Sequence, residues 1–269
     1  MAYISEQQGK CQCNKDPVNS ILFQMLNSGL NTETTRSLQS NHSLICSLDK
    51  GCPCESNRKV LLKSPEVTCK KASEVLLKTV AFIRNVPSFY QLPQDDQILL
   101  VQNCWAPLFV LGLAQERVDF ELQEHFVPSL LKKILLNQCE NVGDVALKSD
   151  GGVPITEVQR IQRFLYKFWS LDICTKEYAY LKGMLLFNSD ISGMKYSHYV
   201  HRLQLEAQYT LMEFTSMMHS QNSIRFMWML EAIDSVKQID PKFITKLFFK
   251  PISGEINLEE LLLETLFVK

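Results

Sequence analysis

The chain has 269 residues, of which 46% are hydrophobic and 10% aromatic, so it has the material for a sizeable core and is not disordered as a whole. Its 28 lysine and arginine residues nearly balance its 29 aspartate and glutamate residues, which gives a formal net charge of −1. That balance argues against a protein that binds the phosphate backbone of nucleic acids, because such binding needs a strongly basic face.

The first residues and the cysteines indicate the cellular compartment in which we expect the protein. The opening sequence, MAYISEQQGK, lacks the charged and apolar regions of a signal peptide, and no apolar run reaches the roughly 18 residues that span a membrane. The nine cysteines are odd in number, and several lie in apolar stretches. We therefore expect reduced thiols in an intracellular protein without membrane contact.

Composition divides the chain near residue 65. Residues 1–64 are rich in serine, asparagine, threonine and glutamine, which bury too little apolar surface to offset the entropy of ordering. We expect most of this tail to be flexible. One island differs, because Leu22, Met25 and Leu26 share a face of a short predicted helix.

The tail also contains two Cys-x-Cys pairs. Cys11 and Cys13 recur 41 residues later as Cys52 and Cys54, and four thiolates are a known zinc ligand set. However, pairs that bind zinc usually have two to four intervening residues, whereas these have one. The spacing therefore favours unligated thiols over a metal site.

From residue 65 onward, apolar residues recur with the period of helices. Pro87 ends the first helix, and the next, from about Gln94 to Arg117, is apolar nearly all round, which predicts burial in the middle of a helical stack. The other expected elements are a strand or β-turn at 118–122, a helix at 128–136, a loop at 137–152, and helices at 155–170, 175–187, 194–219, 223–249 and 257–267. We predict an all-α, layered antiparallel helical sandwich over residues 65–269.

Catalytic signatures are absent from the sequence, and no cofactor or metal is expected. Asp95 and Asp96 are interpreted as acids at a helix amino terminus rather than as an acid and base pair. Cys104 is interpreted as a buried thiol. His198 and His201 lie three residues apart with no acidic or cysteine partner nearby, which favours a solvated helix face over a metal site.

Three segments have an LxxLL-like spacing, in which apolar anchors lie on one face of a turn and can enter a groove on another protein. For residues 131–135 and 258–262, spacing alone favours packing in the core of the chain itself. For residues 22–26, which lie in a polar tail, it favours an exposed docking helix. The candidate docking residues are Leu22, Met25, Leu26, Leu131, Ile134 and Leu135.

Three motifs in order give the folded region a specific resemblance. The first comprises Val86-Pro87-Ser88-Phe89, Leu92-Pro93, Asp96-Gln97, Leu99-Leu100, Trp105 and Leu113-Ala114-Gln115. The second is the run from Lys176 to Asn188, and the third is the carboxy-terminal Leu261-Leu262-Leu263-Glu264-Thr265-Leu266, in which Thr265 departs from the usual apolar residue. Together they resemble the ligand-binding domain of nuclear receptors, over about 200 residues.

The tail has no Cys-x-x-Cys pair and no basic helix, so the chain resembles the orphan receptors that lack a DNA-binding domain. That resemblance implies a transcriptional corepressor whose LxxLL-like segments dock into the activation groove of DNA-bound nuclear receptors. The partners it implies are other nuclear receptors, of the steroidogenic type, and corepressor proteins, with a homodimer as a further possibility. It implies no direct DNA contact, and a location in the nucleus and cytoplasm.

The resemblance also implies a coregulator groove on the domain itself. Arg84 would stand at the end of the third helix of the family fold, where most receptors have lysine, and Glu264 would stand on the last helix, with Leu262 and Leu266 beside it. Charges at opposite ends of a bound helix would complement its dipole. A ligand pocket is the alternative site, and the abundance of residues such as Phe109, Met184 and Met227 favours a small or filled one.

Overall fold

A short strand, β1 (Lys59–Leu62), opens the described part of the chain, which comprises residues 58–125, 152–219, 224–254 and 257–267 of a computed structural model. The described residues from Lys59 onward belong to one compact unit, so β1 lies in the same unit as the helices that follow it. The long helices are α2 (Pro65–Arg84), α4 (Gln94–Gln115), α7 (Ile155–Leu171), α8 (Thr175–Leu186), α9 (Ser197–Met218), α10 (Arg225–Lys237) and α13 (Leu258–Phe267). The shorter elements are α3 (Pro87–Tyr90), β2 (Leu122–His125), β3 (Val153–Pro154), α11 (Pro241–Ile244), the π-helix η3 (Thr245–Phe249) and α12 (Lys250–Ser253).

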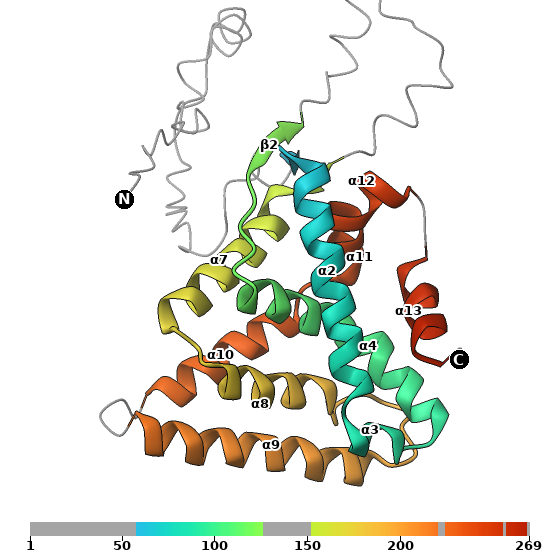
Figure 1. The fold of residues 1–269 in the computed structure, drawn as a ribbon, viewed down its shortest axis with the longest axis vertical. Coiled ribbons are helices and arrows are strands. Elements are labelled where there is room, and N and C mark those ends of the chain that lie inside the picture. Colours follow the sequence, from blue (N-terminus) through green and yellow to red (C-terminus); the bar gives the residue numbers. More distant parts are fainter. Residues whose placement is uncertain (1–57, 126–151, 220–223, 255–256, 268–269) are drawn as a thin grey trace, which may run out of the picture. The chain divides into compact units, whose positions relative to one another are not determined.

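Helix α4 lies at the centre of the layers, as its apolar sequence predicts. It packs against α2, α7, α8 and α10, while α9 packs on the far side of α8 (Figure 1). Every residue from Cys104 to Ala114 is buried. Gly112 lets α2 approach closely, because a Cβ at this position would lie 2.7 Å from Cγ1 of Val75. The layered helical architecture predicted from the sequence is confirmed.

By length and composition, α4 is the one helix among the described residues apolar enough to cross a membrane, although no single run in it reaches 18 apolar residues. In this structure 78% of its most apolar window is buried inside the protein. The core of a layered helical domain accounts for such a helix, because the stretch from Cys104 to Ala114 is buried on all sides.

The predicted strand at 118–122 lies in the wrong place. The strand begins instead at Leu122, and β2 pairs antiparallel with β1, which pairs on its other edge with β3. Pairing with β1 sets this register, and β1 lies upstream of the region expected to fold. The alternation of apolar and polar residues at 118–122 does not mark a strand. Val118 and Phe120 are apolar because both side chains are buried in the core, although the segment that carries them is irregular.

The single helix predicted over 223–249 is also wrong. α10 ends at Lys237, and a new helix begins where the Asp240 carboxylate accepts a hydrogen bond from the Lys242 backbone N–H, 2.9 Å away. Pro241 suits the first position of that helix, because its missing N–H would have no partner there. A break in the helices was predicted at 251–254. Pro251 lies inside α12 instead, and the helix ends at Gly254, whose φ is +70°.

Candidate functional site

The last helix, α13, lies against α2 and α4 (Figure 1). Leu258, Leu262 and Leu266 repeat every four residues, which places them on one face of the helix, and all three are buried. Leu261 lies on another face and is 46% exposed. Core packing, which the spacing at 258–262 favours, is thus observed for Leu258 and Leu262 but not for Leu261.

Arg84, the last residue of α2, binds the carboxyl end of α13. Its Nη2 atom donates a hydrogen bond to the backbone carbonyl of Thr265. The last carbonyls of a helix have no partner within the helix and carry partial negative charge, so a guanidinium group is a complementary cap. A leucine-rich helix docked on α2 and α4 therefore has a cation at its carboxyl end.

Glu264, the predicted acidic residue of the coregulator groove, lies in the last turns of α13. Its side chain is exposed, and it immediately precedes the residue that Arg84 binds. Both charges therefore lie near the carboxyl end of α13, and their role at the two ends of a helix bound from another protein stays a prediction. Thr265, the departure from the family pattern, keeps its hydroxyl within α13 by donating to the Leu261 carbonyl at 2.7 Å.

The acidic pair at the start of α4 is structural. Asp96 is fully buried and accepts hydrogen bonds from the backbone N–H groups of Lys195, at 2.9 Å, and Tyr196, at 2.8 Å. Asp95 forms an exposed ion pair with the Lys195 ammonium group at 2.6 Å. Asp95 and Asp96 together attach the segment before α9 to the start of α4. This role agrees with the interpretation of the two acids as structural residues at a helix amino terminus.

A buried ion pair between α8 and α10 was not anticipated from the sequence. Arg225 donates from Nε to Glu177 Oε1 at 2.8 Å and from Nη2 to Oε2 at 2.7 Å. Its Nη1 atom also donates to the Leu171 carbonyl at 2.5 Å, and Oε2 of Glu177 accepts from the Cys174 N–H at 2.8 Å. The only local signal was a glutamate three residues after a helix cap, which is typical of a capping box.

The protonation of Glu177 follows from these contacts. Burial by itself raises the pKa of this carboxyl group, but the Arg225 hydrogen bonds, the Cys174 N–H and nearby positive charge outweigh burial, so the net pKa is lowered. The hydrogen bonds to Glu177 raise the pKa of Arg225. Both groups are therefore charged at neutral pH, and each satisfies the other.

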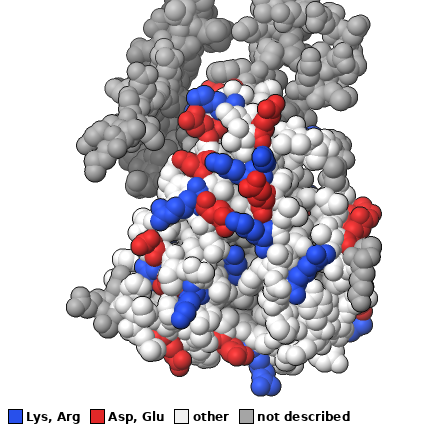
Figure 2. Space-filling view, viewed as in Figure 1, with Lys and Arg blue, Asp and Glu red and all other residues white. Residues whose placement is uncertain are grey.

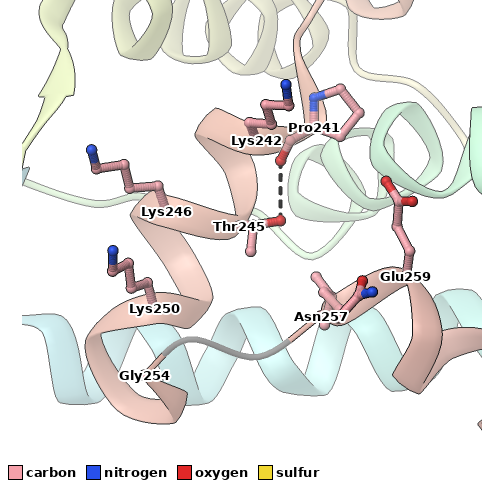
Figure 3. Close-up of a pocket in the computed structure, with 9 residues that line it drawn as sticks. Pro241, Lys242, Thr245, Lys246, Lys250, Gly254, Asn257 and Glu259 are labelled. Atoms are coloured by element: carbon pink, nitrogen blue, oxygen red, sulfur yellow. Dashed lines mark hydrogen bonds between the residues drawn. The ribbon is translucent and has the colours of Figure 1, made fainter.

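A cavity of about 540 Å³ opens beside the amino end of α13 (Figure 3). Lys242, Lys246 and Lys250, four residues apart, line it from α11, η3 and α12, and Leu258 and Glu259 line it from α13. Its other lining residues are Pro241, Thr245, Gly254 and Asn257. Inside the domain, aromatic side chains pack against one another, and the Phe109 ring centroid lies 5.6 Å from that of Phe248 and 5.3 Å from that of Phe249.

Other predicted groups can also be placed. Phe109 and Met184 are buried, but Met227 is 58% exposed and so does not fill the interior. Cys104 is buried in α4, and burial raises the pKa of its thiol. His198 and His201 are both exposed, and among the described residues no cluster of three potential metal ligands occurs.

Comparison with known proteins identifies the fold. Residues 63–252 match the ligand-binding domain of nuclear hormone receptors. The chain belongs to this family. The solved Ultraspiracle ligand-binding domain from Drosophila melanogaster shares the fold, with a TM-score of 0.52 and 26% identity over 74% of this chain and 80% of that one.

Curated relatives place this receptor domain in subfamily 0, group B. It is 39% identical to group B member 2 from Rattus norvegicus, over 98% of this chain and 99% of the relative. It is 41% identical to group B member 1 from Sus scrofa, over 81% of this chain but only 49% of the relative. The chain therefore spans nearly all of one relative and about half of the other.

Within this subfamily, different segments of the sequence resemble different members. Residues 175–181, Glu264 and the pairing of Cys-x-Cys with an Ile-Leu-Phe box resemble the receptor of dosage-sensitive sex reversal and adrenal hypoplasia. The overall length, residues 80–85 and residues 131–136 resemble the small heterodimer partner. From these motifs we predict that the chain is more like the receptor of dosage-sensitive sex reversal and adrenal hypoplasia. The identities, 41% to group B member 1 and 39% to group B member 2, are too similar to choose between the two members.

Several predicted sites lie outside the described residues. They are the tail segment with Leu22, Met25 and Leu26, the segment with Leu131, Ile134 and Leu135, and the two Cys-x-Cys pairs. Of the predicted site residues, Arg84, Leu262, Glu264 and Leu266 are described, and they come together where α13 meets α2.

Proposed function

We propose that this receptor domain belongs to a transcriptional corepressor, whose LxxLL-like helices dock into the activation groove of DNA-bound nuclear receptors and exclude coactivators. The first docking helix is the tail segment at 22–26, and the second is the segment at 131–135. The apolar anchors of such a helix would supply most of the binding free energy.

The docking of α13 is the observation that supports this proposal. In this chain, the nuclear-receptor fold holds a leucine-rich helix on α2 and α4, with Arg84 at the carboxyl end of that helix. A partner receptor has the same fold, so it offers corresponding helices to a leucine-rich helix from outside. Leu22, Met25 and Leu26 give the tail segment the required apolar face.

The charge balance supports the choice of partners. A chain with a net charge of −1 lacks the basic excess for phosphate binding, so we expect it to reach promoters through a DNA-bound receptor of the steroidogenic type. Corepressor proteins would be recruited where α13 meets α2, at the exposed Arg84 and Glu264, while the buried Leu262 and Leu266 hold α13 in place there. The proposal involves no catalysis, and it places the protein in both nucleus and cytoplasm.

The test is a binding measurement on the full chain with the ligand-binding domain of a steroidogenic-type receptor. Leu22→Ala with Leu26→Ala should weaken binding about 30-fold or more, equivalent to about 2 kcal/mol. Leu131→Ala with Leu135→Ala tests the second segment separately. A coactivator peptide should be displaced by the wild-type chain and not by the weakened variant. Unchanged affinity in both double variants would exclude the two segments as docking helices.

A second candidate is a receptor regulated by a small molecule, for which the cavity beside α13 offers space within a mostly polar lining. Its volume of about 540 Å³ is in the range of small-molecule sites. Three lining lysines would favour a ligand that also carries an anionic group. Native mass spectrometry of the purified chain distinguishes the two, because a stoichiometric ligand whose removal abolishes partner binding would support the second.

A further inference from the structure

Three lysines line one wall of the cavity beside α13. Lys242, Lys246 and Lys250 recur every four residues through α11, η3 and α12, which places them on successive helical turns of nearly the same face. Neighbouring lysines are separated by roughly 6 Å along the helix axis, so the three charges extend over roughly 12 Å. Figure 3 shows Lys246 and Lys250 on one side of the cavity and Asn257 and Glu259, at the start of α13, on the other. We name the three residues the lysine ladder.

The described lining of this cavity is positively charged. It contains the lysine ladder and one acidic residue, Glu259, which gives a formal charge of +2, whereas the whole chain has −1. On the face drawn in Figure 2, by contrast, basic and acidic side chains are interspersed. Lys246 and Lys250 are half-buried, and partial burial strengthens the attraction between their charges and an anion. The cavity therefore favours a negatively charged ligand.

The same lining offers little to an apolar ligand. Leu258 is the one large apolar side chain among the described lining residues, and it is only 6% exposed because it packs into the core. The Thr245 hydroxyl donates to the Pro241 carbonyl, one helical turn earlier, at 3.1 Å. The other side-chain donors of the described lining are the ammonium groups of the lysine ladder and the Asn257 amide. Phosphate oxygens accept hydrogen bonds from both kinds of donor, and lysine is a common phosphate-binding residue.

We propose that this cavity binds a polar small molecule that carries two or more phosphate groups. The proposal rests on the second candidate function, a receptor regulated by a small molecule, and names the class of its ligand. A single phosphate group can reach only part of a ladder roughly 12 Å long, whereas linked phosphates can contact all three lysines. A volume of about 540 Å³ accommodates such a molecule. A ligand that contacts both the lysine ladder and Asn257 joins α11 and α12 to the start of α13, so its binding should hold α13 in place.

Isothermal titration calorimetry of the full chain tests the ligand class. At about 0.15 M salt, which screens exposed charges beyond about 8 Å, inorganic tripolyphosphate and adenosine triphosphate should bind with a Kd on the order of 10 µM. Inorganic phosphate should bind at least 30-fold more weakly. Vesicles of phosphatidylcholine with about 10% phosphatidylinositol bisphosphate are the third probe. Binding to these vesicles in preference to tripolyphosphate would also support the proposal, and would assign the phosphates to a lipid headgroup.

Substitutions inside and outside the lining test the residues. Lys246→Gln with Lys250→Gln should weaken tripolyphosphate binding at least 30-fold. The matched control, Lys167→Gln with Lys176→Gln, removes the same charge from α7 and α8 and should keep the wild-type affinity within about twofold. Glu259→Gln removes the acidic side chain of the lining, so it should tighten binding about threefold to tenfold.

A milder variant guards against misfolding. Lys242→Gln changes the exposed lysine of the ladder and should weaken binding about fivefold with an unchanged Tm. In the wild type, saturating tripolyphosphate should also slow hydrogen exchange of the amides in residues 258–267 about fivefold. A wild-type chain that does not bind tripolyphosphate at about 1 mM would overturn the proposal, and so would folded ladder variants that keep the wild-type affinity. Tripolyphosphate binding that leaves the affinity for a partner receptor unchanged would support the ligand class and contradict the second candidate function. Partner binding that depends on a copurified ligand without phosphate would do the reverse.

Discussion

The Arg84 guanidinium group donates a hydrogen bond to the Thr265 carbonyl and so ties the last residue of α2 to the final turn of α13. These residues are 181 positions apart in the chain, whereas the other side-chain hydrogen bonds described for α13 are local: the Glu260 N–H donates to Asn257 Oδ1, and the Thr265 hydroxyl donates to the Leu261 carbonyl. The remaining attachment of α13 is apolar, through Leu258, Leu262 and Leu266. One polar contact, from Arg84, and one apolar face therefore attach α13 to the helices around it. Each attachment can be weakened by its own substitution.

Removing the cap should loosen α13 without unfolding the domain. We expect Arg84→Ala to lower the free energy of local opening of α13 by about 1 kcal/mol, because a solvent-exposed cation at a helix carboxyl end contributes that order of stability. Hydrogen exchange of the amides in residues 258–267 should then quicken about fivefold. Arg84→Lys keeps the charge but loses the planar donor geometry, so its exchange should be intermediate. Unaltered exchange in Arg84→Ala would show that the apolar face alone holds α13.

The apolar face is tested by two neighbouring leucines of unequal burial. Leu262 is 4% exposed and Leu261 is 46% exposed. Leu262→Ala should cost about 2–3 kcal/mol in the docking of α13, whereas Leu261→Ala should cost less than about 0.5 kcal/mol. Limited proteolysis and hydrogen exchange of α13 measure both. Equal effects would mean that α13 docks through the 258, 261 and 262 positions instead of every fourth residue.

Helix positions were predictable because they depend on local periodicity. The continuous apolar sequence of α4 predicts burial on all sides, and packing against α2, α7, α8 and α10 confirms it. The strand at 122–125 was misplaced because its register depends on β1, about 60 residues upstream, and such pairing leaves no local periodic signal. The break before α11 was missed because Asp240 and Pro241 lie within an apolar pattern that continues across them.

The candidate site was only partly predictable for a similar reason. Arg84, Leu262, Glu264 and Leu266 were identified through the resemblance to nuclear receptors, but which backbone group Arg84 binds depends on how α13 docks. The Glu177–Arg225 pair joins helices 48 residues apart, and neither residue lies in a pattern that marks it as buried. Charged residues are almost never fully buried without a partner, so the sequence alone favours exposed positions for both.

Breaking the Glu177–Arg225 pair should destabilise the whole domain. Arg225→Ala leaves a carboxylate that is 0% exposed without its counter-charge, which costs about 3–5 kcal/mol. The matched control is Lys167→Ala, because the Lys167–Glu231 pair joins α7 and α10 at the surface, with Glu231 71% exposed. That variant should cost less than about 1 kcal/mol. Chemical denaturation of the two variants measures both values, and a similar loss in each would show that burial of the Arg225 pair adds nothing.

The Glu177–Arg225 pair should also make the free energy of unfolding of the domain decrease at acidic pH. The pKa of Glu177 is lower in the folded chain than in the unfolded chain, so below about pH 4.3 the unfolded chain binds the extra proton first. The contribution of Glu177 to stability is therefore complete above that pH and is lost as pH falls through the folded-state pKa. Urea unfolding between pH 7 and pH 3 should show this decline in the wild type and a shallower one in Glu177→Gln. Glu231→Gln, which removes an exposed carboxylate, should retain the wild-type slope, and a wild-type slope in Glu177→Gln would mean that other carboxylates cause the acid response.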